Sequence, residues 1–130
     1  SLLQTRPLRG ALALALALAA APAMAQSPFS STVFFGDSLT DSGHFRPVLT
    51  QITLRQVAGR FTTNPGYVWA EYLAKHYGTL ALPNGNGQGG DNYAVGGARV
   101  AVDTVGALGA TPAMTTQLAT YLAANGGQAD

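Results

Sequence analysis

The 130-residue sequence contains no cysteine, which excludes a disulfide framework, a thiolate nucleophile and a zinc site with cysteine ligands. Charged residues make up only 10% of the chain, against about 25% in an ordinary soluble domain. The formal net charge is +1, so the sequence lacks the clustered basic residues that bind nucleic acid. Its two histidines, His44 and His76, are too few and too far apart to suggest a metal site. The length allows for one domain, since domains usually run roughly 100–200 residues.

The N-terminus has the three parts of an export signal in order. Two arginines precede an uninterrupted run of small apolar residues at 10–21, and Ala23-Met24-Ala25 forms an A-x-A cleavage site. The run is too short to cross a bilayer, which takes about 20 residues. A buried Ala/Leu helix is the alternative interpretation. The pattern predicts a signal peptide over residues 1–25 and a mature, exported part over 26–130, located in the periplasm, at the cell surface or outer membrane, or secreted.

Two strand-like runs stand out in the mature part. Val33-Phe34-Phe35 is a short β-branched and aromatic run that stops at a glycine, and Tyr93-Ala94-Val95 is a second run that ends in a glycine doublet. Residues 44–59 show no clear period, which predicts loop with some helix.

Two helices are predicted from cap-plus-proline signals. Asn64-Pro65 is typical of an N-cap followed by proline, and Thr111-Pro112 repeats the signal. The residues expected to face the core are Val68, Trp69, Tyr72, Leu73 and His76 in the first helix, which stops at Gly78, and Met114, Leu118, Tyr121 and Leu122 in the second. For Trp69 and Tyr72, a place in the wall of a substrate site is the alternative. The order strand–loop–helix, used twice, favours a parallel α/β sheet.

The segment most informative about chemistry follows the first strand. Ser38 comes two residues after Gly36, on the loop that leaves the sheet, and ligands of open α/β sheets bind outside the carboxyl ends of the strands. A serine at this place suits a nucleophile, provided that a base activates it. The alternative is that Ser38, Asp41 and Ser42 are turn and cap residues only.

Three segments together carry a family resemblance. Residues 34–43, FFGDSLTDSG, resemble the first signature block of the GDSL lipases and esterases, also called SGNH hydrolases, and residues 92–98, NYAVGGA, are similar to the second. Residues 59–65, GRFTTNP, are similar to a segment often found between the two blocks. The resemblance implies a three-layer, flavodoxin-like α/β fold with a parallel sheet, of which residues 26–130 would form the N-terminal part.

The resemblance also implies roles for individual residues. Ser38 would be the nucleophile and its backbone N–H an oxyanion donor, with a second N–H from Gly97 or, as the second choice, Gly96. Asp37 and Asp41 would support the loop through hydrogen bonds to the backbone. No metal and no organic cofactor are implied.

Two later blocks of the family are not found in the 130 residues. One supplies an asparagine oxyanion donor in a G-x-N-D context, and the other, Asp-x-x-His, supplies the acid and the base. His44 is the nearest histidine to Ser38, but nothing in the sequence orients it as a base, so a surface or cleft position is expected for it. His76 is expected to be partly buried. We therefore expect negligible turnover by this chain alone.

The implied function is hydrolysis of carboxylic esters, small or lipid, through an acyl-enzyme. The combined motifs look most like those of the autotransporter esterases, in which a C-terminal β-barrel anchors the catalytic domain at the outer membrane. Two alternatives remain open at this point: a carbohydrate O-acetyl esterase of the same family, and a non-catalytic module that binds a glycan or a surface.

Overall fold

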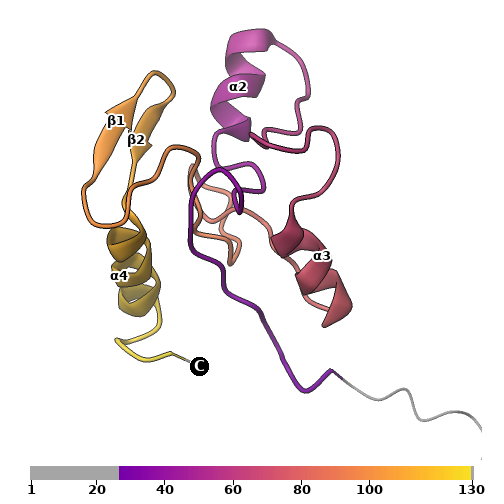
Figure 1. The fold of residues 1–130 in the computed structure, drawn as a ribbon, viewed down its shortest axis with the longest axis vertical. Helices are drawn as coiled ribbons and strands as arrows, with labels where there is room; N and C mark the ends of the chain where they lie inside the picture. Colours follow the sequence, from indigo (N-terminus) through magenta and orange to yellow (C-terminus); the bar gives the residue numbers. More distant parts are fainter. Residues whose placement is uncertain (1–26, 130) are drawn as a thin grey trace, which may run out of the picture.

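The structure is a computed structural model that describes residues 27–129. The predicted signal peptide, residues 1–25, lies outside the described residues. Figure 1 shows three helices, α2 (Arg46–Thr53), α3 (Trp69–His76) and α4 (Met114–Ala124), and two strands, β1 (Thr104–Gly106) and β2 (Gly109–Thr111). None of these helices combines the length and the hydropathy that a membrane crossing requires.

The centre of the fold is a set of short extended segments that pair in parallel. Phe34 and Asn92 form one parallel bridge, and Asn92 forms another with Pro83 on its other side. The first pairing continues through two hydrogen bonds, from the Tyr93 N–H to the Phe34 carbonyl (2.8 Å) and from the Val95 N–H to the Gly36 carbonyl (3.1 Å). The two predicted strands are thus found as single bridges in parallel pairing. Within residues 27–129 they do not extend into the predicted three-layer sheet.

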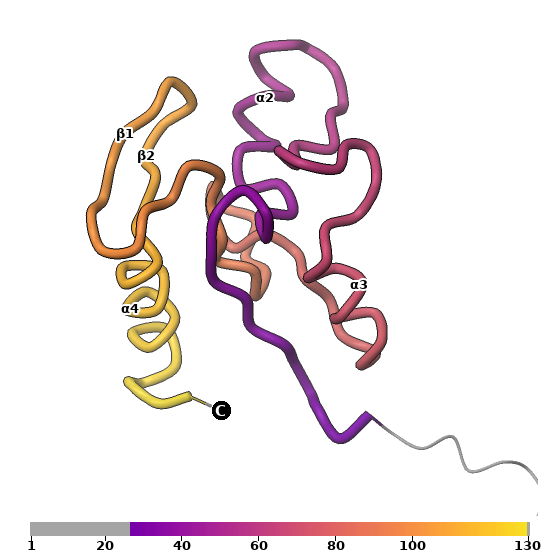
Figure 2. Tube along the Cα trace, viewed as in Figure 1, coloured from indigo at the N-terminus to yellow at the C-terminus, as the bar shows by residue number. Residues whose placement is uncertain are grey.

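The N-terminal segment runs between α3 and α4 (Figure 2). On one side, the Phe34 ring contacts the ring of Trp69 at the start of α3, with centroids 5.7 Å apart. On the other side, the Phe35 ring lies 5.8 Å from that of Tyr121 in α4. The alternation of successive side chains along an extended segment places the two phenylalanines on opposite faces.

Helix α3 begins at Trp69, four residues after Pro65, which the sequence had predicted as its first residue. The Asn64 side-chain oxygen accepts a hydrogen bond from the Arg60 N–H (3.0 Å) instead of capping a helix. Helix α3 starts after Val68, whose N–H donates to the Glu71 carboxylate (2.9 Å). This contact is one half of a capping box and satisfies a backbone donor at the helix start. The stop predicted at Gly78 is confirmed, because that glycine follows the last turn with a φ of +70°.

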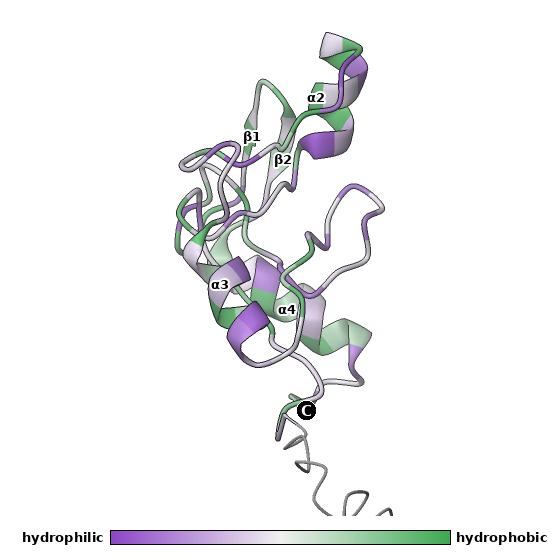
Figure 3. Ribbon diagram, turned by 90° about the vertical axis from the view of Figure 1, so that its right-hand side faces the viewer, coloured by the Kyte–Doolittle hydropathy of each residue, from purple (hydrophilic) through white to green (hydrophobic). Residues whose placement is uncertain are grey.

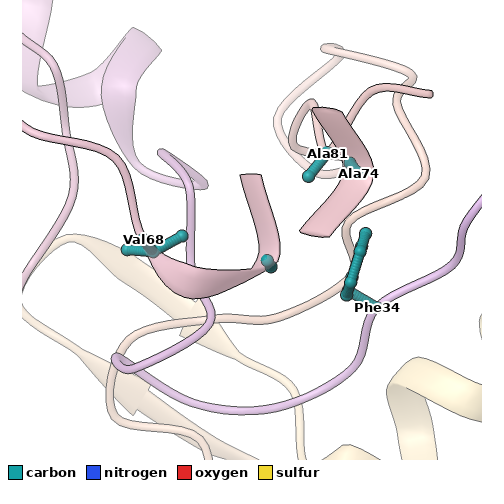
Figure 4. Close-up of a cluster of buried hydrophobic side chains, with 5 residues drawn as sticks. Phe34, Val68, Ala74 and Ala81 are labelled. Carbon is teal, nitrogen blue, oxygen red and sulfur yellow. The ribbon is translucent and has the colours of Figure 1, made fainter. Parts of the chain in front are cut away.

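The buried face of α3 is not the predicted aromatic one. Figure 4 shows the core cluster of Phe34, Val68, Ala70, Ala74 and Ala81. Trp69 and Tyr72 are 52% and 60% exposed, and His76 is exposed as well, so the prediction that all three face the core is wrong. Small alanines four residues apart form the buried side of α3. Tyr72 and His76 lie on the exposed side, and Trp69 keeps its contact with the Phe34 ring while half of its surface is exposed. Figure 3 shows hydrophilic and hydrophobic segments side by side on this helix.

Helix α4 also differs from its predicted face and start. Thr111 is the last residue of β2, and the N-cap is Ala113, whose N–H donates to the Asp103 carboxylate (2.8 Å). The buried residues of the helix are Gln117 and Tyr121. Met114 and Leu118, predicted as core, are 37% and 45% exposed. Tyr121, also predicted as core, is 8% exposed, so that part of the prediction is confirmed. The prediction missed Gln117 because it counted only apolar residues.

Strands β1 and β2 form an antiparallel hairpin that the sequence analysis did not predict. Thr104 pairs with Thr111, and Gly106 pairs with Gly109 across a two-residue turn. The turn residues, Ala107 and Leu108, are not one of the Asn-Gly, Asp-Gly or other glycine-containing pairs that mark a two-residue hairpin turn in a sequence, so the usual signal is missing. The hairpin lies above α4 in Figure 1.

Candidate active site

Ser38 lies in a tight turn directly after the paired segment that ends at Gly36. The Asp37 carboxylate accepts a hydrogen bond from the Leu39 N–H (3.0 Å), and the Asp37 carbonyl accepts from the N–H groups of Thr40 (3.0 Å) and Asp41 (2.9 Å). Asp37 thus organises the turn around Ser38, as an aspartate often does through its own backbone. Ser38 itself is half-buried. Neither its backbone N–H nor its hydroxyl donates a hydrogen bond to any atom of residues 27–129.

Asp41 joins this turn to the glycine doublet. Its side chain is fully buried, and one carboxylate oxygen accepts from the N–H groups of Gly43 and His44, both at 2.7 Å. The other oxygen accepts from the Gly96 N–H, also at 2.7 Å, across 55 positions of sequence. Hydrogen bonds to an ionised acceptor are about twice as strong as neutral ones. Asp41 therefore fixes the position of the two loops relative to each other.

Asn92 forms a second connection, to which the sequence analysis assigned no role. Its amide group donates to the Thr40 carbonyl (2.8 Å) and to the Ser42 hydroxyl (2.9 Å). Ser42 in turn donates to the Ala81 carbonyl (2.5 Å). Both side chains are almost fully buried, so Ser42 has the structural role that its place in a turn had suggested as the alternative. The signal that could have found Asn92 is a polar amide at the start of a buried apolar strand.

The two glycines of the doublet differ in their surroundings. Gly96 is buried, its N–H donates to Asp41, and the Phe61 ring fills the space that a side chain at this position would need. Gly97 is exposed, has a φ of +85°, and donates no backbone hydrogen bond within the described part of the chain. Of the two N–H groups, only that of Gly97 is available to a ligand.

A pocket of about 390 Å³ opens beside the doublet. It falls in the range of roughly 300–1,000 Å³ that holds small ligands. Its walls include the rings of Phe45 and Phe61, which meet edge to face. The rest of the lining is Gly96, Gly97, Arg99, Thr104, Val105, Gly106, Ala107, Leu108 and Thr111. The unpredicted hairpin thus forms one wall, and Arg99 is the pocket's charged lining residue.

Neither histidine ring makes a hydrogen bond to Ser38 within the described residues. His44 is 8% exposed, so it is not a surface residue, and no hydrogen bond joins its ring to Ser38 in residues 27–129. His44 lines a separate pocket of about 160 Å³. The His44 ring packs so closely against Gly85 that a side chain at position 85 would overlap the ring. Burial lowers the pKa of His44, and the charge of Asp41 opposes this shift. His76 lies on the exposed side of α3.

The part of the chain that the structure describes contains no cluster of side chains that could hold a metal ion. No group of three or more histidine, aspartate or glutamate side chains converges among residues 27–129. The carboxylates of the site are occupied by backbone N–H groups, as described for Asp37 and Asp41.

Comparison with known proteins connects these features to a family. The family model of the GDSL-like lipase/acylhydrolase domain matches residues 32–127. The match includes the Ser38 turn, Asp41 and the glycine doublet. A search of curated proteins finds no match. The family match implies the α/β fold of the SGNH hydrolases, to which the parallel pairing of the central segments conforms, and it supports hydrolysis of ester substrates in general. Because the match covers most of the sequence, the chain belongs to the GDSL-like lipase/acylhydrolase family.

Proposed function

We propose that this protein is a serine ester hydrolase in which Ser38 attacks the ester carbonyl and forms an acyl-enzyme. The observation that carries the proposal is the pair of unoccupied N–H groups of Ser38 and Gly97, on two loops that Asp41 ties together. Backbone N–H groups held in advance are the usual means of stabilising the oxyanion of a tetrahedral intermediate. Glycine suits the second position because a substrate oxygen can approach a backbone without Cβ.

In the proposed reaction, the Ser38 oxygen bonds to the acyl carbon as its proton passes to a base. The alcohol leaves with that proton, and water then releases the acid. The resemblance assigns the base to an Asp-x-x-His motif and a third oxyanion donor to an asparagine. The 130 residues do not contain these motifs. We therefore expect the full-length gene product, with any sequence encoded after Asp130, to hydrolyse esters and the 130-residue chain to show negligible turnover.

The pocket beside Gly97 supports a carboxylic ester with an acyl group longer than acetyl. Its aromatic and aliphatic lining, with Phe45, Phe61 and Leu108, would bury several methylene groups, each contributing about 0.8 kcal/mol. An acetyl group would leave most of that lining in contact with water. A chain-length series of p-nitrophenyl esters tests this: activity highest on acetate would favour the O-acetyl esterase instead.

The proposal includes export. Residues 1–25 would direct the protein out of the cytoplasm, and the autotransporter-like motifs would place it at the outer membrane. N-terminal sequencing of the protein recovered from fractionated cells tests both points. A mature protein beginning at Gln26 in the envelope or medium supports export, whereas an intact leader in the cytoplasm contradicts it.

Labelling with a fluorophosphonate probe tests the central proposal. We expect the full-length protein to be labelled at Ser38 and to lose both labelling and ester hydrolysis in the Ser38→Ala variant. The exposed Ser31 provides a matched control, and Ser31→Ala should leave both unchanged. Absence of labelling in the folded wild-type protein would contradict the proposal and favour the non-catalytic binding module.

A further inference from the structure

We propose that Gln117 is a positioning residue that sets the orientation of the nucleophile loop. The inference rests on the proposed function, because it takes Ser38 as the nucleophile. It concerns a residue 81 positions away from Gly36 in sequence, on α4, that touches neither Ser38 nor the pocket beside Gly97. Gln117 acts through the backbone of Gly36, two residues before the nucleophile.

The Gln117 amide pairs with the peptide groups of Gly36 as a neighbouring strand would. The Gly36 N–H donates to the side-chain oxygen of Gln117 at 2.9 Å, and the side-chain nitrogen donates to the Gly36 carbonyl at 2.9 Å. On the other side, the Gly36 carbonyl accepts from the Val95 N–H (3.1 Å). The extended segment is therefore held from both sides at its last residue, once by backbone and once by this side chain.

At Gly36, hydrogen bonds from outside the segment have a large influence on the direction of the chain. Its φ is +151°, and a Cβ there would lie 3.0 Å from the Thr40 hydroxyl oxygen, so the turn requires glycine. Glycine has little conformational preference of its own. The direction in which the chain leaves Gly36 toward Ser38 is consequently set by the groups that bind its peptide units.

Gln117 is itself rigidly placed. Its side chain is 2% exposed, and its nitrogen also donates to the Pro112 carbonyl (3.1 Å) at the start of α4. One helical turn further on, the Tyr121 ring packs against Phe35 and Tyr93, with centroids 5.8 Å away in both cases. A long amide side chain would lose considerable rotamer freedom on burial, and this placement confines it to one geometry.

The two hydrogen bonds between the Gln117 amide and Gly36 can be tested by changing the donors and acceptors of this side chain. An amide offers one acceptor and one donor to Gly36, whereas leucine offers neither. A glutamate at this position would accept from the Gly36 N–H, but its second oxygen would face the Gly36 carbonyl while it is ionised. When protonated, the same carboxyl group offers one acceptor and one donor and again matches the peptide. Burial raises the pKa of a carboxyl group, so we expect a larger protonated fraction as the pH falls. His44 and Tyr93 are the titratable residues that line the same pocket as Gln117.

The experiment compares Gln117→Leu and Gln117→Glu in the full-length protein with the wild type. We expect Gln117→Leu to lower the rate of fluorophosphonate labelling and kcat by about tenfold or more, since small misplacements of reacting groups cost this much, with KM within about twofold. For Gln117→Glu, the ratio of its rate to that of wild type should rise as the pH falls from about 8 to about 5. Gln51→Glu, on the exposed side of α2, is the control whose ratio should stay flat.

The outcomes separate the two proposals. If the wild type is not labelled, the proposed function fails and this inference fails with it. If the wild type is labelled at Ser38 and the Gln117→Glu ratio is flat with pH, or Gln117→Leu reacts at the wild-type rate, the positioning role alone is overturned. Should Gln117→Leu fail to fold, the pH dependence of Gln117→Glu still decides.

Discussion

Replacing Asp41 by asparagine should destabilise the protein strongly although the change conserves the shape of the side chain. The buried carboxylate accepts three backbone N–H groups, each at 2.7 Å. An asparagine oxygen can still accept from Gly43 and His44 without the benefit of charge. Its NH₂ group would then face the Gly96 N–H, donor against donor.

The magnitude follows from these contacts. Hydrogen bonds to charged groups contribute about 1.5–3 kcal/mol each, and a buried donor without a partner costs about 1–3 kcal/mol. Losing the bond to Gly96 and weakening the other two should lower the free energy of unfolding by about 2–4 kcal/mol. Asp41→Ala would leave all three donors unpaired, a loss near the whole stability of about 5–15 kcal/mol that is typical of a domain. Asp41→Asn is therefore the informative variant.

Urea unfolding of the full-length protein, followed by circular dichroism, measures this loss. Asp91→Asn is the matched control, since Asp91 is exposed and its carboxylate makes no hydrogen bond within residues 27–129. The control should change the free energy of unfolding by less than about 0.5 kcal/mol. Hydrogen exchange at the Gly96 amide should also become faster in Asp41→Asn. A loss no larger than that of the control, with unchanged Gly96 exchange, would refute the reasoning.

Three further predictions follow from individual contacts. Gly97→Ala keeps the backbone N–H and puts a Cβ in ordinary contact with the Thr111 methyl, 3.6 Å away, but at a φ of +85°, a strain of about 1–2 kcal/mol. We expect the Cβ to hinder the approach of the substrate oxygen, so ester hydrolysis by the full-length protein should fall while circular dichroism shows a folded chain; an unchanged kcat would contradict close approach of the substrate to this N–H. Arg60→Met breaks a bidentate ion pair with Glu71, both contacts at 2.6 Å, and should lower the free energy of unfolding in urea by about 1.5–3 kcal/mol. Adding Glu71→Gln should cost less than the sum of the two single changes. Because burial lowers the pKa of His44, the folded protein binds a proton at this imidazole less readily than the unfolded chain does, so the free energy of unfolding should fall as the pH drops through about 6.5. His44→Gln should show a smaller fall between about pH 7.5 and pH 5.5, and an equal fall in the two proteins would contradict this account.

The local motifs could be interpreted from sequence because they depend on residue types at short spacing. The segment around Ser38 and the glycine doublet predicted the family, which the match over residues 32–127 confirms. The stop of α3 at Gly78 was predictable for the same reason, since a positive φ after a helix favours glycine. The start of α3 was not, because Asn64 serves a contact with Arg60 that pattern alone does not reveal.

Helix faces were the weakest part of the prediction. Hydropathy counts favoured Trp69, Tyr72, Met114 and Leu118 as core residues, and all four are at least one-third exposed. The structure buries alanines in α3 and a glutamine in α4 instead. Close approach of a helix needs small side chains, and a buried amide is stable where its polar atoms are satisfied. Both conditions depend on the neighbouring segments rather than on the helix itself.

By itself, the sequence determined which chemistry is available: a serine on a glycine-bounded turn, no thiol, and two loops with the pattern of one hydrolase family. Only the tertiary structure decided which atoms are free to act. Asp41 occupies the N–H of Gly96 and leaves that of Gly97 open, and Gln117 reaches Gly36 across 81 positions of sequence. Hydrogen bonds between distant segments depend on where the folded chain places their donors and acceptors. Residue patterns at short spacing do not predict these positions.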